Sequence, residues 1–474
     1  MSSTASRGRA VGVDRVTQRA SRRSQRRARG IVANSSPSSD EFVHFAEERS
    51  VRIALSAGTF YRAESSQARD LECVLASLER KRRCHRLSFL DGACASGARG
   101  ARLLAMDVVE RLTCVDVSSD VRAALVHNLE THARDTSLEN VECIFEDVQR
   151  VFARKWLDGE FYDFVDVDGF GSTNFADGAL RVVRHGGFFY ATCTDGRALC
   201  GQNPGRCATA FANAVVAPSR PAVNETAMRA LIADVVRRAD ALKLRATPVF
   251  SLFHPHGPVF RCMFRIEKRT ARGYDAFDED SRRVGFSGYC DACGSTVTVR
   301  RPLVTLYGHA KLADNEPRGE TLRCALCASR SDAGDAGVSP RSSQLAISGP
   351  LWIGPLHDLD TIRAMRDEAH ALGWLDAVEQ RVQGQLSLRD LFDVFEGEAD
   401  PALGAHYYRT DELGRKGRAS RVPPRDALLA ALRSEGYRAA RSSFDPRGMK
   451  TDASLDDVVA CADRLCHALD VGGA

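Results

Sequence analysis

Two aspartates, Asp166 and Asp168, lie at the end of a short apolar run in the first half of the chain. Residues 164–172 read FVDVDGFGS, which predicts a buried strand that ends in a glycine-containing turn. An exocyclic amine of a base is a weak nucleophile because its lone pair is delocalised into the ring, so methyl transfer to it needs an acceptor for an N–H. The carboxylate of Asp168, helped by the Gly169 carbonyl, can be that acceptor, and Phe170 can stack on the base. A structural acidic turn with an aromatic plug is the alternative.

Small and acidic residues follow three earlier apolar runs. Residues 91–99 read DGACASGAR directly after Leu87–Leu90. Small side chains let the backbone approach a ligand, and the next helix offers free N–H groups. Asp116 ends the second run and can accept both ribose hydroxyls of a nucleoside, and Asp147 follows the third and can accept an adenine amine. The glycine-rich turn alone fits a tight turn equally well, but the three acids in register favour a nucleoside cofactor.

Four of the 15 cysteines form two C-x-x-C pairs. The pairs are Cys290 with Cys293 and Cys324 with Cys327, and thirty residues separate them. Four thiolates give a closed tetrahedral zinc site, which is structural because no position remains for water. A thioredoxin-type redox site is the weaker alternative, since it needs only one pair in a βαβ context.

The elements that must position these residues alternate between strand and helix patterns. A helix is expected at Ala98–Arg111 and another at Ala227–Leu244. Such alternation predicts a doubly wound parallel sheet, whose ligands lie at the carboxyl ends of the strands. The predicted strands are Leu87–Leu90, Leu112–Val117, Val141–Phe145, Tyr162–Val167 and Phe188–Thr192, with Pro248–Phe253 and Val259–Ile266 as an antiparallel pair.

We divide the chain by composition into a basic segment at 1–39, a sheet-containing domain at 40–270, a cysteine segment with a loop at 271–345, and a smaller α+β domain at 346–474. Residues 40–86 are expected to be helical. Helical patterns recur at Leu356–Leu372 and Arg425–Leu432. The fold class is therefore α/β with a smaller C-terminal domain.

The formal net charge of +4 hides an asymmetry, since residues 1–39 contain nine Arg, no Lys and one Asp. This Ser- and Arg-rich segment without an apolar core is typical of an organellar transit peptide; a disordered basic tail and a nuclear signal within Arg22–Arg29 are the alternatives. The cysteine usage without a secretory signal favours a reducing compartment. No apolar stretch is long enough to span a membrane, so a soluble protein is expected, with a monomer favoured.

Several motifs in one order resemble the tRNA guanine-26 N2-dimethyltransferase family over roughly residues 40 to 460. The strand ends at 89–99 and 165–172 resemble the family's cofactor and catalytic motifs. NETAMR at 224–229, GPLWIGPLHD at 349–358 and GYRAARSSFDPRGMKTDA at 436–453 resemble its later signatures.

The resemblance implies an S-adenosylmethionine-dependent methyltransferase with a Rossmann-like sheet, a C-terminal domain that binds tRNA, and zinc at the four cysteines. Asp168 would be the catalytic carboxylate, and Arg441 and Lys450 would contact phosphates. Cofactor contacts are implied at Arg69, Asp91, Gly92, Ala93, Ser96, Gly97, Arg99, Asp116, Val117, Asp147 and Val148.

The chain departs from the family at two motifs. The family's Asp-Pro-Phe-Gly is here Asp168-Gly169-Phe170-Gly171, and glycine lacks the fixed φ of proline. An aromatic-polar-proline motif is only partly kept at residues 60–63. Two alternatives therefore stay open: a tRNA-binding relative that has lost turnover, and an amino methyltransferase for another RNA base.

Overall fold

The computed structural model describes residues 42–133, 136, 138–169, 174–215, 220–255, 257–269, 283–300, 323–332, 344–375, 385–415 and 421–471. The predicted transit segment at 1–39 lies outside the described residues. So does Phe170, together with Gly171 and Ser172 of the predicted catalytic turn.

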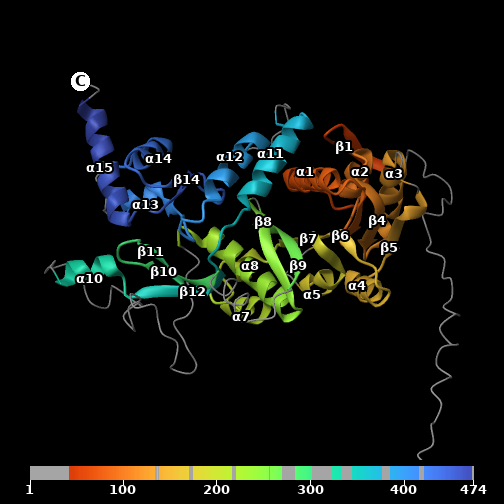
Figure 1. Ribbon diagram of the computed structural model, residues 1–474, viewed down its shortest axis with the longest axis horizontal. Coiled ribbons are helices and arrows are strands. Elements are labelled where there is room, and N and C mark those ends of the chain that lie inside the picture. The colour runs from red at the N-terminus through yellow and green to blue at the C-terminus, as the bar shows by residue number, and fades with distance from the viewer. Residues whose placement is uncertain are drawn as a thin grey trace, which may run out of the picture.

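A seven-stranded sheet in the order β5-β4-β3-β6-β7-β9-β8 forms the centre of the molecule (Figure 1). The first five strands of this order are parallel, and β9 runs antiparallel to both β7 and β8. The predicted doubly wound sheet is thus confirmed. Chain order reverses beside β3, and ligands bind at such a switch point. The strands are β3 (Leu87–Asp91), β4 (Val109–Asp116), β5 (Val141–Phe145), β6 (Tyr162–Val167), β7 (Val183–Cys193), β8 (Leu244–His254) and β9 (Val259–Lys268).

Alternating side chains along the strands build a core on each face of the sheet. On one face the rings of Phe89, Phe164 and Phe188 stack with successive centroid distances of 5.7 and 4.7 Å, under α1 (Ser66–Arg83), α2 (Ala98–Ala105) and α3 (Arg122–His132). On the other face Val165 and Phe189 are buried. That face is covered by α4 (Val148–Leu157), α5 (Ala176–Val182), α6 (Gly196–Leu199), α7 (Pro204–Phe211) and α8 (Val223–Ala241).

The prediction that residues 40–86 are helical is wrong for its first part. Phe42–Glu48 (β1) and Val51–Ser56 (β2) pair as an antiparallel hairpin, and α1 begins only at Ser66. Val51, Ile53 and Leu55 of β2 pack against α2, which holds the hairpin on the core.

The predicted helix at Ala98–Arg111 is also too long. It ends at Ala105, and β4 begins three residues before the predicted strand. Asp107 has a φ of 53°, which ends the helix. Its carboxylate is held there by Arg80 at 3.0 Å and Arg86 at 2.9 Å. Similarly, β7 begins at Val183 rather than at Phe188.

Two three-stranded antiparallel sheets follow in the rest of the described chain. Helices α11 and α12 add Ile362, Met365, Phe392 and Phe395 to the core beneath α1, so the chain after residue 346 returns to the central sheet. The elements are β10 (Val284–Cys290), β11 (Thr296–Arg300), α10 (Ala325–Asp332), β12 (Leu345–Trp352), α11 (Leu359–Ala371), α12 (Leu388–Glu398), β13 (Tyr408–Arg409), α13 (Thr410–Arg415), α14 (Arg425–Ser434), β14 (Ala439–Arg441), β15 (Gly448–Thr451) and α15 (Leu455–Val471).

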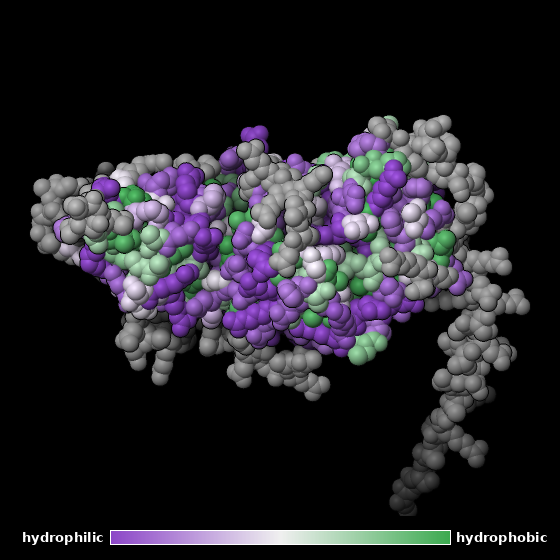
Figure 2. Space-filling view, turned by 90° about the horizontal axis from the view of Figure 1, so that it is seen from above, coloured by the Kyte–Doolittle hydropathy of each residue, from purple (hydrophilic) through white to green (hydrophobic). Residues whose placement is uncertain are grey.

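The molecule is elongated, with α14 and α15 at the end opposite β4 and β5 (Figure 1). One face mixes hydrophilic and hydrophobic patches along its length (Figure 2). Within the described ranges, no helix is both long and apolar enough to cross a membrane.

Candidate active site

The turn after β3 is shaped by its small residues. Gly97 has a φ of 74°, and a Cβ there would lie 2.5 Å from Leu125 Cδ1, so a larger residue would force the turn apart. The N–H of Gly92 donates to the Asp166 carbonyl at 2.8 Å, which ties the turn to β6. This turn therefore brings the backbone of residues 92–97 to the carboxyl end of the sheet.

The acidic residues at the ends of β4 and β5 border this turn. The two Asp116 carboxylate oxygens accept from the N–H groups of Ala95 and Ser118, both at 2.9 Å. Asp147 caps α4 by accepting from Gln149 N at 2.7 Å. Next to these acids, Val117 is 78% exposed and Val148 is buried. The structure thus brings the predicted strand-end acids to one edge of the sheet.

Asp168 lies just beyond β6 and keeps part of its surface open. Its side chain is 19% exposed, and both oxygens accept from Arg261 Nη2 at 3.0 Å. Arg99 Nη2 lies 3.7 Å from Asp168 Oδ2. Burial tends to raise the pKa of Asp168, but the charges of Arg261 and Arg99 outweigh it and hold this pKa below the ordinary value. Asp168 is therefore a carboxylate at neutral pH.

Arg99 sits under the turn with its side chain only 5% exposed. It pairs with Glu72 and Asp166 and lies 3.5 Å from Asp91 Oδ2. Burial raises the pKa of Glu72 to about 7 and raises those of Asp91 and Asp166, against the opposing charge of Arg99. The base of the site thus holds more carboxylates than cations.

Arg69 is fixed on α1 by the hairpin before it. Its Nε donates to both carboxylate oxygens of Glu48 at 3.1 and 3.0 Å, and Tyr61 Oη donates to Glu48 at 2.7 Å. Burial opposes ionisation of Glu48, but Arg69 and Arg102 lower its pKa to about 2. Glu48, at the end of the unpredicted strand β1, therefore orients Arg69, a predicted cofactor residue.

A cleft that is open to solvent joins these parts. Of the predicted site residues it is lined by Arg69, Asp91, Ala93, Ser96, Arg99, Asp168 and Gly169. The remaining described ones, Gly92, Gly97, Asp116, Val117, Asp147 and Val148, are not among its lining residues. A ligand that reaches Asp116 must therefore extend from the cleft over Ala95.

Sequence reasoning missed Arg261, Ser65 and Glu72. Arg261 Nη2 donates to Ser65 Oγ at 3.2 Å as well as to Asp168, and both residues line the cleft. The sequence could have indicated Arg261. An arginine within the apolar strand Val259–Lys268 is expected to be buried, and a buried arginine needs a carboxylate partner. Glu72 carries the same signal on the buried face of α1.

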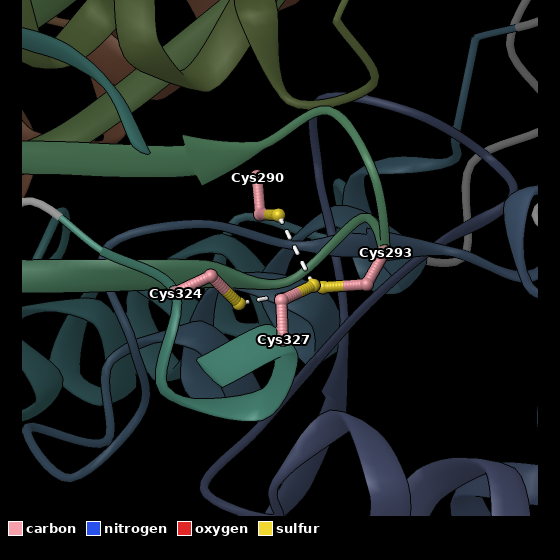
Figure 3. Close-up of side chains that lie close together, drawn as sticks. All are labelled: Cys290, Cys293, Cys324 and Cys327. Carbon is pink, nitrogen blue, oxygen red and sulfur yellow. Dashed lines mark hydrogen bonds between the residues drawn. The ribbon is translucent and has the colours of Figure 1, made fainter. Parts of the chain in front are cut away.

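The four predicted metal ligands meet between the end of β10 and α10 (Figure 3). Their Sγ atoms lie within 4.8 Å of one another, with Cys290 to Cys327 at 3.7 Å and Cys293 to Cys324 at 3.5 Å. Four sulfurs at about 2.3 Å from one zinc ion would lie about 3.8 Å apart in a tetrahedron. The four free, buried thiols fit that geometry.

Comparisons with known proteins identify the family. A family model described as N2,N2-dimethylguanosine tRNA methyltransferase matches residues 41–462. The chain belongs to this family. A relative from Pyrococcus abyssi, named tRNA (guanine(26)-N(2))-dimethyltransferase, is 26% identical over 84% of this chain and 91% of its own length. One of the same name from Methanospirillum hungatei is 27% identical over 86% and 92%.

A solved structure, Trm1 from Pyrococcus horikoshii in complex with S-adenosyl-L-methionine, superposes with a TM-score of 0.67. It is 22% identical and covers 88% of this chain and 99% of its own. The methyltransferase fold therefore extends over nearly all of the chain after the basic segment.

Lys450, one of the residues expected to contact tRNA, is buried in the structure. The Lys450 side chain is 1% exposed and its Nζ lies 2.7 Å from Glu225 Oε1, so the prediction of a phosphate contact is wrong for it. Arg441 is 44% exposed and pairs with Asp426 at 2.6 Å. All four residues of β15 are buried, and a strand of this length carries no sequence pattern that predicts the burial of Lys450.

Proposed function

We propose that this chain transfers a methyl group from S-adenosylmethionine to the exocyclic N2 of guanine 26 in tRNA, giving N2-methyl- and N2,N2-dimethylguanosine. The names of the relatives and the family match support the substrate. The observation that carries the proposal is Asp168, an ionised carboxylate that faces an open cleft at the end of β6.

The cleft fits the cofactor by charge. S-adenosylmethionine has a carboxylate, an ammonium group and a sulfonium, and the cleft presents Arg69 for the first and Asp91 for the positive groups. Asp91 Oδ2 has no hydrogen-bond partner among the described residues, so it keeps acceptor capacity. Asp116 would hold the ribose and Asp147 the adenine. When bound, the cofactor supplies an electrophilic methyl group.

The chain's own groups act on the base. Asp168 accepts one N–H of the exocyclic amine and the Gly169 carbonyl accepts the other, which holds the nitrogen lone pair toward the methyl group. Because Arg261 stabilises the ionised form, Asp168 is a strong orienting acceptor and a weak base at neutral pH. Since the cleft is open, the proton released on methylation can leave through water.

The test is transfer of labelled methyl from S-adenosylmethionine to unmodified tRNA by the full chain, followed by nucleoside analysis. Asp168→Asn keeps the size of the side chain and should lower the rate by about 10²- to 10⁴-fold while cofactor binding persists. Asp158→Asn is the matched control, because Asp158 is exposed at the end of α4. Methyl groups on another position or base would favour the other-base alternative. Binding of both ligands without product would favour the relative that has lost turnover.

We also propose that the four cysteines hold a structural zinc ion. The support is the tetrahedral spacing of the sulfurs and their burial between β10 and α10. Metal analysis of the purified protein should find about one zinc per chain. Cys324→Ser should lose it, whereas Cys84→Ser, at an exposed cysteine far from the cluster in sequence, should retain it. A zinc content that is equal in both variants would contradict the site.

We propose organellar import directed by residues 1–39, supported by their composition. A fusion of residues 1–39 to a fluorescent protein should enter mitochondria or plastids. Nuclear accumulation that depends on Arg22–Arg29 would instead support the nuclear alternative.

A further inference from the structure

The three later signature segments meet in one place, although the cleft uses none of them. Residues 224–229 lie on α8, residues 349–358 connect β12 to α11, and residues 436–453 contain β14 and β15. Helix α8 packs against β12, and β14 packs against α12 (Figure 1).

Three of their charged side chains form a buried group with Glu398 of α12. We call this group the junction cluster: Glu225, Arg229, Glu398 and Lys450. Lys450 Nζ lies 2.7 Å from Glu225 Oε1 and 3.7 Å from Glu398 Oε1. Arg229 Nε donates to Glu225 Oε1 at 2.8 Å. Each of these side chains is at most 3% exposed. Two cations and two carboxylates thus balance each other away from water.

The cluster also ties down the segment between β12 and α11. Arg229 Nη1 donates to the carbonyls of Trp352 at 2.8 Å and Gly354 at 2.9 Å. His357 stacks on Phe395 of α12 with a centroid distance of 4.1 Å, and its Nε2 lies 3.5 Å from Glu398 Oε2. Four elements distant in sequence are therefore locked by directional contacts.

Helix α12 connects this cluster to the cleft. Glu398 is its last residue, and the residues just before its start contact the cleft wall. Gln67 Nε2 donates to the Leu386 carbonyl at 2.8 Å, and Gln385 Nε2 donates to the Glu64 carbonyl at 2.9 Å. Glu64 precedes Ser65, which lines the cleft. These two hydrogen bonds hold the start of α12 beside the cleft, while its end at Glu398 belongs to the junction cluster.

Apolar packing alone would hold the C-terminal domain on the central sheet without selecting one orientation, because hydrophobic contact is not directional. A buried ion pair adds little net stability but requires one geometry, which makes it suited to fixing a register. A substrate as large as tRNA can contact the C-terminal domain while one base enters the cleft. The placement of the C-terminal domain relative to the cleft therefore determines whether a tRNA bound to both is positioned for methyl transfer.

We propose that Lys450, Glu225 and Glu398 are positioning residues that fix the C-terminal domain in one register on the central sheet, so that a single tRNA engages both. This inference rests on the proposed function. It predicts a defect in the use of tRNA with cofactor affinity retained, since no residue of the junction cluster lines the cleft and the start of α12 is held by hydrogen bonds of its own.

The experiment measures KM for tRNA, kcat, cofactor affinity and the melting temperature for three variants of the full chain, well below their melting temperatures. Lys450→Met should raise KM for tRNA at least about tenfold, since one buried carboxylate loses its partner, with cofactor affinity unchanged. The double variant Glu225→Gln with Lys450→Met restores charge balance and should recover the melting temperature while KM stays raised. Glu435→Gln, at the exposed pair with Arg464, is the control and should leave all four values unchanged.

A purely stabilising role would lower the melting temperature of Lys450→Met and leave KM unchanged, which would overturn the proposal. Recovery of KM in the double variant would overturn it too. If Lys450→Met does not fold, the double variant alone decides the question. Should the wild type transfer no methyl group, the proposed function fails, and tRNA affinity of the same variants still tests the positioning role.

Discussion

Two of the buried groups of charges in the described part of the molecule differ in balance. The cleft cluster lies beneath the cofactor turn and has four carboxylates for two arginines: Glu72, Asp91, Asp166 and Asp168 with Arg99 and Arg261. The junction cluster has two of each sign. Burial raises the pKa of Glu72, Asp91 and Asp166, whereas Lys450 holds the pKa of Glu398 below its ordinary value against the effect of burial.

The difference in charge balance indicates which cluster binds a ligand. A balanced group is complete by itself, as the junction cluster is. An excess of buried carboxylates is costly unless something positive completes it, and such groups are typical of functional sites. The cofactor, with its ammonium and sulfonium, would bring positive charge to the cleft cluster. The comparison can be tested by removing single charges.

The largest effect is expected from Arg99→Met, which removes the cation shared by the cleft carboxylates. Unpaired buried carboxylates should cost about 3–5 kcal/mol in the free energy of unfolding at pH 8. The loss should shrink as the pH falls, because protonated carboxylates no longer need a cation. Urea unfolding at pH 8 and pH 5 would measure both. Arg441→Met should change stability by less than about 0.5 kcal/mol, and a pH-independent loss for Arg99→Met would argue against charge excess.

The parts of this site that follow simple periodic patterns could be predicted from sequence. Asp91, Asp116, Asp147 and Asp168 each end an apolar run, and parallel strands bring such ends to one edge of a sheet. The C-x-x-C spacing likewise predicted the cysteine cluster, because ligand chemistry restricts that spacing.

What could not be predicted depends on partners far apart in sequence. The pairing of Arg261 with Asp168 joins residues 93 positions apart across β6, β7 and β9. β1 and β2 were missed because hairpin pairing, not local propensity, holds that segment extended. Lys450 was misplaced because the three-stranded sheet that turns it inward forms only with β13 and β14.

A second test compares two buried glutamates with opposite pKa shifts, beginning with Glu48. Its folded pKa of about 2 lies below the ordinary 4.5. A lowered pKa stabilises the fold above pH 4.5, and this stability is lost as the pH falls toward 2. Glu48→Gln should therefore cost about 3 kcal/mol at pH 7 and progressively less below pH 4.5. Unfolding free energies at pH 7 and pH 3 would show it, and equal losses at both would refute the lowered pKa.

Glu72 should behave in the opposite way. Its folded pKa of about 7 lies above 4.5, so the fold loses stability as the pH rises from 4.5 through 7. Glu72→Gln removes the charge that burial disfavours and should stabilise the protein by about 3 kcal/mol at pH 8, with little change at pH 4. Saturating S-adenosylmethionine should reduce the gain if the cofactor's positive charge completes the cleft cluster. If Glu72→Gln is less stable than the wild type at pH 8, the Glu72 carboxylate stabilises the fold as an ion pair, like the carboxylates of the junction cluster.

The smallest effect is expected at Gly169, the point where this chain departs from the family's proline. A Cβ there would lie 3.4 Å from Phe175 Cε2 and 3.9 Å from Ala93 Cβ, so there is room for a side chain. Gly169→Pro should fix φ near −65° and hold the carbonyl that accepts the amine N–H, raising kcat by about threefold and stability by up to about 1 kcal/mol. Gly205→Ala, in open space on α7, should gain similar stability without a change in kcat. If kcat of Gly169→Pro falls while cofactor still binds, the cleft of this chain has adapted to the flexible turn, and the carbonyl is not the second acceptor.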